Sequence, residues 1–291
     1  MTVHELVVDA GGRLGRAGIR QSEARLDAET LARRLLGWDA ARFLTSRGEE
    51  APAGFPEHYD RLIRRRERRE PTSYIMGSKE FWGLDFEVSS DVLIPRPETE
   101  FLVEEALECS RALPPTIARA LVVDVGTGSG CVAVALAHEM ASARIVATDI
   151  SAAALDVARR NAIRHGVANR VHFVRTDFLA GIGPCADLIV SNPPYVPRAH
   201  AAGLSPEVRD FEPHVALFGG ADGLEKQQML LEQAAGCLAP SGYLLVEFGD
   251  GQEEALRALL ASWPSFRIVR VRSDLQGIPR TMVVTRSTNL F

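Results

Sequence analysis

Short apolar segments alternate with amphipathic segments through the second half of the chain, and this alternation is the feature that most constrains the fold. The apolar segments read LVVDVG (121–126), RIVATD (144–149), VHFVRTD (171–177), DLIVSN (187–192) and YLLVEFG (243–249). Between them lie helical stretches such as SAAALDVARRNAIRHG, with Ser151 as the predicted N-cap and Gly166 as the stop. Near-continuous apolar strands separated by helices predict a parallel sheet with helices on both faces.

Two further strand-like segments close the chain, FRIVRVRS (266–273) and RTMVVTR (280–286). They are too close in sequence for a helical crossover, so they predict an antiparallel hairpin at one edge of the sheet. The predicted class is therefore α/β, a Rossmann-like domain with a mostly parallel seven-stranded sheet.

The first 75 or so residues predict short helices instead. SEARLDAETLARRLLGW has a possible N-cap at Ser22 and apolar residues at Leu26, Leu31 and Leu35, close to helical spacing. A second helix, EHYDRLIRRRERRE, carries Tyr59 on its apolar side.

Leu62 and Ile63 share that apolar side, and Pro71 is expected to end the helix. Six arginines lie between residues 61 and 70. They could face RNA, but a solvated helix face is the favoured interpretation.

A linker is predicted between the helices and the sheet. FWGLDFEV (81–88) and DVLIPR (91–96) are strand-like, and the turn-forming Ser89-Ser90-Asp91 separates them. We therefore expect a helical domain (1–76), a β-hairpin linker (77–97) and the α/β domain (98–291).

Composition narrows the possible partners and the compartment. The net charge of −5 argues against nucleic acid as the main substrate. The four cysteines form no C-x-x-C pair and the histidines are scattered, so buried reduced thiols are expected and no metal site is predicted. The chain begins without a basic segment and apolar run, and no stretch approaches the ~18 apolar residues of a membrane span. A cytoplasmic protein with no membrane partner is expected.

A glycine-rich loop follows the first strand of the sheet and opens a helix. It reads Asp124-Val-Gly126-Thr127-Gly128-Ser129-Gly130. A dinucleotide fingerprint requires glycine at position 131, where Cys131 stands. The G-x-G-x-G spacing resembles the first motif of the Rossmann-like methyltransferases, which implies that this loop holds the methionine part of S-adenosylmethionine.

Acidic and aromatic residues follow the next two strands. Asp149 is placed to accept hydrogen bonds from both hydroxyls of a ribose. Asp177 and Phe178 provide an acceptor and an aromatic face for an adenine. Asp149 could instead cap the next helix and Phe178 could be a core residue, but the combination with the glycine loop favours a cofactor site.

The fourth strand ends in Ser191-Asn192-Pro193-Pro194-Tyr195, which we expect to face the glycine loop across one cleft. Asn192 and Pro193 both precede a proline, which favours extended backbone at both residues. The Asn192 side-chain oxygen and the Pro193 carbonyl can then accept hydrogen bonds from the two N–H groups of a planar, poorly nucleophilic NH₂ group. Tyr195 would stack over that group.

This N-P-P-Y corner by itself predicts only a planar conjugated NH₂ acceptor. Adenine, guanine and glutamine all fit. The long aperiodic segment from residue 196 to about 223 predicts a lid over the acceptor.

Several segments together give a specific resemblance. PTSYIMGSKEFWGLDFEV, VLIPRPETE, DVGTGSG, ATDIS, SNPPYVP, FEP and GGADGL resemble the HemK/PrmC family of peptide chain release factor glutamine methyltransferases, from about Pro71 onward. The resemblance implies methylation of the glutamine in the Gly-Gly-Gln loop of class I release factors. It also implies S-adenosyl-L-methionine as donor and S-adenosyl-L-homocysteine as product, with contacts from Gly126 through Gly130, Asp149, Phe178 and Asn192. The substrate amide is implied to lie against Asn192 to Tyr195.

The sequence leaves some roles open. Some relatives have tryptophan where Phe178 stands. Arg96, Glu98 and Glu100 could order the cleft wall or form a salt-bridged hinge, and Glu212 has the same ambiguity.

Two other functions compete with the release-factor enzyme. A nucleic-acid amino-group methyltransferase shares the N-P-P-Y chemistry, but the chain is acidic and shows no basic target-recognition domain apart from the arginine run. A non-catalytic module that senses the cofactor is the second, and the intact N-P-P-Y corner argues against it. The helical domain suggests that a monomer recognises a macromolecule.

Overall fold

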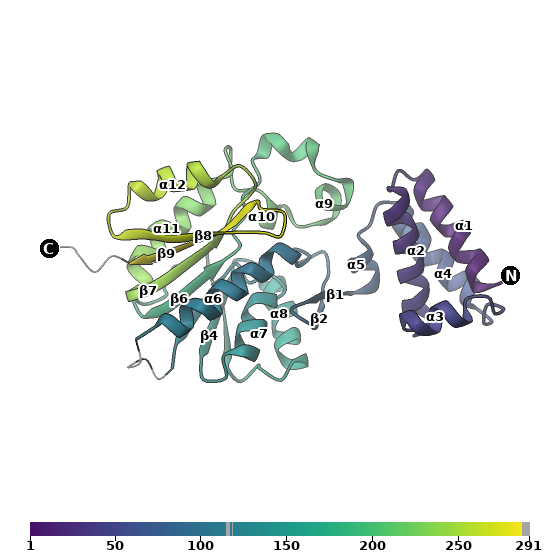
Figure 1. Ribbon diagram of the computed structural model, residues 1–291, viewed down its shortest axis with the longest axis horizontal. Helices are drawn as coiled ribbons and strands as arrows, with labels where there is room; N and C mark the ends of the chain where they lie inside the picture. The colour runs from purple at the N-terminus through teal and green to yellow at the C-terminus, as the bar shows by residue number, and fades with distance from the viewer. Residues whose placement is uncertain (115–116, 118, 287–291) are drawn as a thin grey trace. The chain divides into compact units, whose positions relative to one another are not determined.

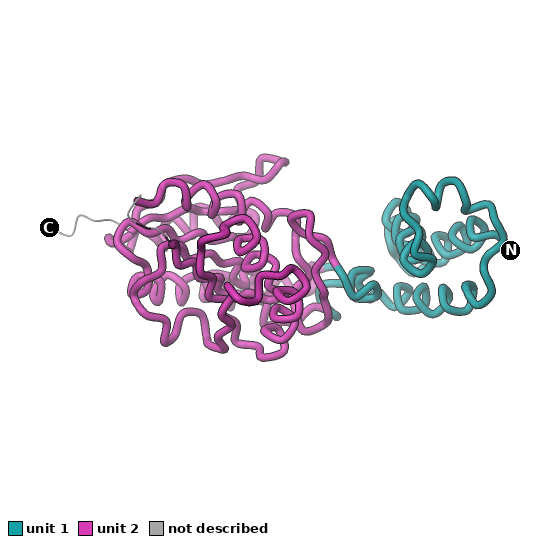
Figure 2. Tube along the Cα trace, turned by 90° about the horizontal axis from the view of Figure 1, so that it is seen from below, with its two compact units in different colours: residues 1–78, 205–211 teal, residues 79–204, 212–291 magenta. Residues whose placement is uncertain are grey.

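Two compact units make up the protein in a computed structural model, which describes residues 1–114, 117 and 119–286. The smaller unit contains residues 1–78 together with 205–211, and the larger contains 79–204 and 212–291 (Figure 2). The segment 205–211 therefore belongs to the helical unit, although it lies in the middle of the predicted α/β domain.

The smaller unit is a helical bundle. Its helices are α1 (Val3–Arg16), α2 (Gln21–Leu36), α3 (Ala40–Ser46), α4 (Phe55–Glu67), α5 (Thr72–Met76) and the inserted α9 (Pro206–Phe211). Its core includes Leu14, Phe43, Tyr59 and Ile63, all at most 2% exposed. The predicted apolar side of α4 is thus confirmed, with Leu62 partly buried beside it.

Helix α2 corrects two expectations. It begins at Gln21 with Arg20 as N-cap and no side-chain cap, so Ser22 does not cap it. Leu31 is buried, but Leu26 is 63% exposed and Leu35 lies at the surface. The buried face is made mainly of alanines, because small side chains allow α2 to pack closely in the bundle.

Arg61, Arg64 and Arg68 of the arginine run are exposed, as a solvated helix face predicts, but Arg66 and Arg69 are held in ion pairs. Arg66 is 1% exposed and its guanidinium donates to Asp27 (2.7 Å), Glu23 (3.2 Å) and Glu207 (2.8 Å). Arg69 donates to the same Glu207 carboxylate through two nitrogens, each at 2.7 Å. Arg66 and Arg69 therefore connect α2 and the end of α4 to α9 by ion pairs within the helical unit.

A small hairpin opens the larger unit, but it lies earlier than predicted. Strands β1 (Ser78–Phe81) and β2 (Leu84–Glu87) pair around Trp82-Gly83, which both have positive φ (56° and 70°). Two positive-φ residues suit a tight hairpin whose twist matches its strands. The Ser89 carbonyl does accept from the Val92 amide in a turn, yet residues 92–96 that follow form no strand.

The main sheet has seven strands. They are β3 (Leu121–Val125), β4 (Arg144–Asp149), β5 (Val171–Arg175), β6 (Ala186–Ser191), β7 (Leu238–Glu247), β8 (Phe266–Ser273) and β9 (Pro279–Arg286). Their order is β5-β4-β3-β6-β7-β9-β8. The first five are parallel, whereas β9 pairs antiparallel with β7 and β8, which confirms the predicted edge hairpin.

Helices cover both faces of this sheet (Figure 1). The 3-10 turn η1 (Pro97–Thr99) leads into α6 (Glu100–Ala112), which packs with α7 (Cys131–Glu139) and α8 (Ala152–Arg164) on one face. The opposite face is covered by α11 (Glu225–Cys237) and α12 (Glu253–Ala261). The intervening segment, predicted as aperiodic, contains η2 (Arg198–Gly203), α9 and α10 (His214–Leu217).

The winding direction reverses between β3 and β6. The chain proceeds from β3 outward to β4 and β5, then returns to place β6 on the other side of β3. In such sheets ligands bind at the carboxyl ends of the strands beside the reversal. The loops after β3 and β6 are the glycine loop and the Asn192 corner, so the topology brings the two predicted motifs together.

Three of the four cysteines are buried as expected, but Cys185 is exposed. Within the described residues no helix is long and apolar enough to cross a membrane.

Candidate active site

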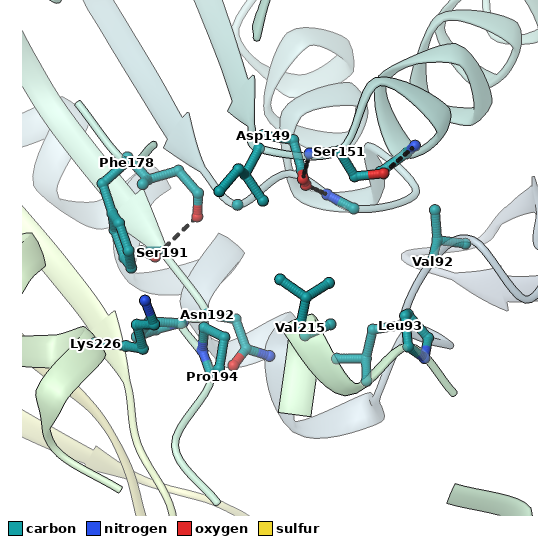
Figure 3. Close-up of a pocket in the computed structure, with 18 of the residues that line it drawn as sticks. Val92, Leu93, Asp149, Ser151, Phe178, Ser191, Asn192, Pro194, Val215 and Lys226 are labelled. Carbon is teal, nitrogen blue, oxygen red and sulfur yellow. Dashed lines mark hydrogen bonds between the residues drawn. The ribbon is translucent and has the colours of Figure 1, made fainter. Parts of the chain in front are cut away.

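A cavity lies at the carboxyl ends of the parallel strands, within the larger unit. It encloses about 800 Å³ of atom-free space, part of it open to solvent, which falls in the usual range for ligand sites. Figure 3 shows Asp149 on one side, Asn192 and Pro194 on the opposite side, and Phe178 and Leu93 toward its two ends. Predicted site residues on the lining are Gly126, Gly128, Asp149, Asp177, Phe178, Asn192, Pro193 and Pro194.

The glycine loop leaves open space where side chains would otherwise project. Gly126 and Gly128 have positive φ (72° and 55°), and a Cβ added to either would meet no atom within 4 Å. The Gly126 amide donates to the Thr148 carbonyl and the Gly128 amide donates to Asp149, each at 2.9 Å. The loop is therefore held in place by β4 while its surface faces the cavity.

Thr127, Ser129 and Gly130 do not line the cavity and support the loop from behind. The Thr127 hydroxyl donates to the buried Asp124 carboxylate at 2.5 Å, and the Ser129 carbonyl accepts from a side-chain amide of α8 at 2.8 Å. A Cβ at Gly130 would come within 2.9 Å of Ala158, so glycine is needed where α7 meets α8.

Asp149 holds the end of β4 against the loop. Its Oδ2 accepts from the Gly128 amide and its Oδ1 from the Ser151 amide, each at 2.9 Å. Ser151 itself caps α8, since its Oγ accepts from the Ala154 amide, so Asp149 is not the N-cap. Burial raises the pKa of Asp149, and the backbone amides of Ser151 and Gly128 oppose that rise.

Asp177 and Phe178 lie just beyond β5 rather than at its last residues. Asp177 is exposed, and Phe178 has a positive φ of 53° that is unusual for an aromatic residue. The Phe178 ring is half-buried: it packs against the core and also lines the cavity. The Lys226 ammonium lies 5.8 Å from the ring centroid (Figure 3).

The Asn192 corner is fixed by the strand that precedes it. Ser191 pairs in register with Val125, and its hydroxyl donates to the Val125 carbonyl at 2.8 Å. Beyond it, the Asn192 Nδ2 donates to the Thr99 hydroxyl at 3.0 Å. Because Nδ2 has this partner, Oδ1 is the atom of the Asn192 amide that can accept a hydrogen bond from a substrate.

Tyr195 lies behind the corner rather than on the lining. Its carbonyl accepts from the Gln252 Nε2 at 3.0 Å, and its ring packs so closely on Gly249 that an added Cβ there would lie 2.9 Å away. Burial raises the pKa of Tyr195 to about 12. The expected stacking of this ring on the acceptor stays a prediction.

Several lining residues were not predicted. Val92 and Leu93 come from the irregular segment after β2, Val215 and Ala216 come from α10, and Lys226 comes from α11. Apolar residues in irregular segments show no periodicity that identifies a cavity wall. The only signal in the sequence was that Val92 and Leu93 belong to the VLIPRPETE motif.

Arg96 and Glu212, whose roles the sequence left open, form an ion pair beside this wall. Arg96 donates to the buried Glu212 at 2.6 Å, and Glu212 also accepts from the Ile94 amide at 3.4 Å. This pair connects the segment bearing Leu93 to the residue before Pro213, which also lines the cavity. Burial raises the pKa of Glu212, and Arg96 opposes that rise.

Glu100 has a different contact. One of its carboxylate oxygens accepts from the Trp82 amide at 2.8 Å, which connects the start of α6 to the hairpin turn.

Solved structures and family models agree with this architecture. The catalytic domain of hMettl16 in complex with a MAT2A 3′UTR hairpin has a TM-score of 0.56 at 13% identity, over 72% of this chain and 78% of that one. A methyltransferase from Pyrococcus furiosus has a TM-score of 0.50 at 19% identity, over 71% of this chain and 91% of that one. The methyltransferase small domain family matches residues 101–204. Fold and site thus define a Rossmann-like methyltransferase.

Curated relatives narrow the class further. A release factor glutamine methyltransferase of Bradyrhizobium diazoefficiens is 43% identical over 267 residues, covering 89% of this chain and 87% of that protein. One from Moorella thermoacetica is 40% identical over 291 residues, covering 98% and 99%. The PrmC N-terminal domain family also matches residues 5–77. The chain belongs to the release factor glutamine methyltransferases.

S-adenosylmethionine is the methyl donor of this enzyme. The cavity suits it: the open surface at Gly126 and Gly128 leaves room for close approach of a ligand to the backbone, and Asp149 offers acceptors beside it.

Proposed function

We propose that this enzyme methylates the side-chain amide nitrogen (N5) of the glutamine in the Gly-Gly-Gln motif of class I peptide chain release factors, and so modulates translation termination. The names of the curated relatives support the substrate. The observation that carries the chemistry is the Asn192 side chain at the cavity edge, with Nδ2 bonded to Thr99 and Oδ1 available as an acceptor.

The acceptor nitrogen is a poor nucleophile because its lone pair is delocalised into the amide. Asn192 Oδ1 and the Pro193 carbonyl would accept hydrogen bonds from the two N–H groups of this nitrogen. These bonds would orient the nitrogen and direct its electron density toward the methyl group. When bound, S-adenosylmethionine supplies a methyl group on a positively charged sulfur, which departs as a neutral thioether. Orientation of this kind provides effective molarities of about 10⁵ M or more in favourable cases.

The proton balance needs no general base before transfer. The nitrogen–carbon bond forms as the carbon–sulfur bond breaks, and the methylated nitrogen becomes acidic enough to lose its proton to water. We assign the cofactor site to the loop Gly126 through Gly130, Asp149, Asp177, Phe178 and Asn192, with Gly126 and Gly128 as the loop residues in contact, and substrate contacts to Asn192 through Tyr195. Thr127, Ser129 and Gly130 would act by shaping the loop.

The helical unit would recognise the release factor, and we propose a cytoplasmic monomer. Ion pairs of Glu207 with Arg66 and Arg69 connect α9 to this unit. The predicted lid segment between residues 196 and 223 would therefore include one helix that belongs to the helical unit.

Transfer of radiolabelled methyl tests the proposal. Purified release factor should gain label from the enzyme and labelled donor, whereas a release factor with asparagine in place of the motif glutamine should gain none. Asn192→Ala should lower kcat by about 10²-fold or more, because the nitrogen loses one of its two acceptors. Equal or greater labelling of RNA or DNA would contradict the proposal.

A further inference from the structure

Two buried polar side chains, Thr99 and Glu247, lie next to the partly buried Asn192 of the N-P-P-Y corner. Thr99 is 3% exposed and Glu247 1% exposed, and neither lines the cavity. Thr99 accepts from the Asn192 Nδ2 at 3.0 Å, and the Glu247 carboxylate lies within hydrogen-bonding reach of the side chains of both Thr99 and Asn192. The Asn192 side-chain amide is therefore the meeting point of three elements far apart in sequence: η1, the end of β6 and the end of β7.

Ordinary structural roles do not account for this group. Thr99 stands at the N-cap of α6, but its side chain makes no cap hydrogen bond, so the hydroxyl is not used to begin the helix. Among the described residues, the Glu247 Oε2 has no hydrogen-bond partner. A buried carboxylate with one unsatisfied oxygen is costly, and residues of this kind are rarely kept for stability.

The direction of the hydrogen bonds gives the group a function. An ionised Glu247 can only accept, so the Thr99 hydroxyl must donate to it and can offer only lone pairs to its other neighbour. The other neighbour is Asn192, which must therefore donate an N–H to Thr99. This requirement selects one of the two orientations of the Asn192 amide. The selected orientation directs Nδ2 inward and leaves Oδ1 for the substrate.

We propose that Thr99 and Glu247 are positioning residues that hold the Asn192 amide in the orientation required to accept a hydrogen bond from the methyl-acceptor nitrogen. The inference rests on the proposed function for the identity of the acceptor, but the orientation of Asn192 is a property of the free enzyme. A neutral Glu247 could itself donate to the Thr99 hydroxyl. Thr99 could then donate its own hydrogen to Asn192, and the orientation of the Asn192 amide would no longer be fixed.

Other charges near Glu247 must be considered in any test of pH. Glu98 from η1 and Arg280 from β9 act on it with opposite signs. Tyr195 from the corner and Cys131 from α7 are also close enough to interact with it.

The test compares Thr99→Val, which keeps the shape of the side chain and removes the hydroxyl, with Thr99→Ser, which keeps the hydroxyl. Thr99→Val should lower kcat for release-factor methylation about 10²-fold. Its Kd for S-adenosylmethionine should stay within twofold of wild type, because Thr99 does not line the cavity. Thr99→Ser should restore kcat to within about threefold. Retention of kcat by Thr99→Val, or a loss matched by an equal loss of cofactor affinity, would overturn the inference.

Glu247→Gln supplies the second readout. The kcat of wild type should rise as Glu247 ionises between pH 6 and 8, whereas Glu247→Gln should lack this component and fall about tenfold below wild type at pH 8. Parallel pH profiles would count against a role for the ionised carboxylate.

A measurement without substrate separates this inference from the proposed function. The side-chain NH₂ signals of Asn192, assigned by their absence in Asn192→Ala, should exchange with solvent at least about tenfold faster in Thr99→Val than in wild type. An inactive wild type would contradict the proposed function, and the exchange rates would still decide the inference. Equal exchange rates in the two proteins would overturn it.

Discussion

Ser191 and Val125 are register partners on adjacent parallel strands, and the Ser191 hydroxyl donates to the Val125 carbonyl at 2.8 Å. The glycine loop follows Val125 and the N-P-P-Y corner follows Ser191. This contact therefore places the loop for the methyl donor and the loop for the methyl acceptor at the same level of the sheet. Ser191→Ala should lower the free energy of unfolding by about 1 kcal/mol, since a buried hydrogen bond is lost. Urea unfolding measures this, and an unchanged midpoint would show that the contact is not needed.

Gly126 and Gly130 should respond differently to substitution, although both have positive φ. Gly126→Ala places a methyl group in open space on the cavity surface, so it should weaken binding of S-adenosylmethionine and lower stability by only about 1 kcal/mol. Gly130→Ala adds a clash with Ala158 to the backbone strain and should cost about 3 kcal/mol. Calorimetry of binding and thermal unfolding of both variants check this, and the reverse ranking would be inconsistent with the loop geometry.

Glu207 should control the attachment of α9 to the helical unit. Burial would raise the pKa of Glu207, but the ion pairs with Arg69 and Arg66 outweigh it and lower the pKa to about 2. The contribution of Glu207 to stability is therefore complete above pH 4.5 and is lost as the pH falls toward 2. Glu207→Gln should speed proteolysis between residues 198 and 212 at pH 7 and lower kcat/KM for the release factor. The exposed substitution Glu254→Gln on α12 is the control, and equal proteolysis of the two variants would contradict the attachment.

Glu247 should make the protein less stable as the pH rises. Burial raises its pKa from 4.5 to about 7, so the favourable neutral form is fully present below pH 4.5 and is lost as the pH rises through 7. At pH 8 the penalty is about 3 kcal/mol. Denaturant unfolding from pH 5 to 8 should show a decline that is smaller in Glu247→Gln by roughly this amount. A variant as pH-dependent as wild type would argue against the ionisation.

Buried Asp124 has the same direction of shift, to about 7, so part of the decline will remain in Glu247→Gln. If Glu247→Gln is more stable than wild type at pH 8 but has a lower kcat, Glu247 serves to position Asn192 and lowers the stability of the protein.

The sequence predicts the sheet and the two facing loops well, because each depends on local patterns. The β-branched strands of residues 121–126 and 144–149 are continuous enough to locate within one residue. The Trp82-Gly83 turn was missed because an aromatic residue inside FWGLDFEV is typical of a strand, and only its positive φ reveals the turn.

Contacts between distant segments could not be predicted in the same way. Asn192 and Thr99 are 93 positions apart, and Arg66 and Glu207 are 141 apart. Neither partner carries a local signal of the other. Leu26 and Leu35 show the related difficulty in α2, where alanines together with Leu31 form the packed face and the other two leucines are exposed.

The most direct test of the central claim is tandem mass spectrometry of a release factor after incubation with this enzyme and S-adenosylmethionine. One methyl group should appear on the side-chain nitrogen of the Gly-Gly-Gln glutamine with wild type, and it should be absent with Asn192→Ala. A methyl group on any other residue, or unchanged methylation of the glutamine by Asn192→Ala, would contradict the account.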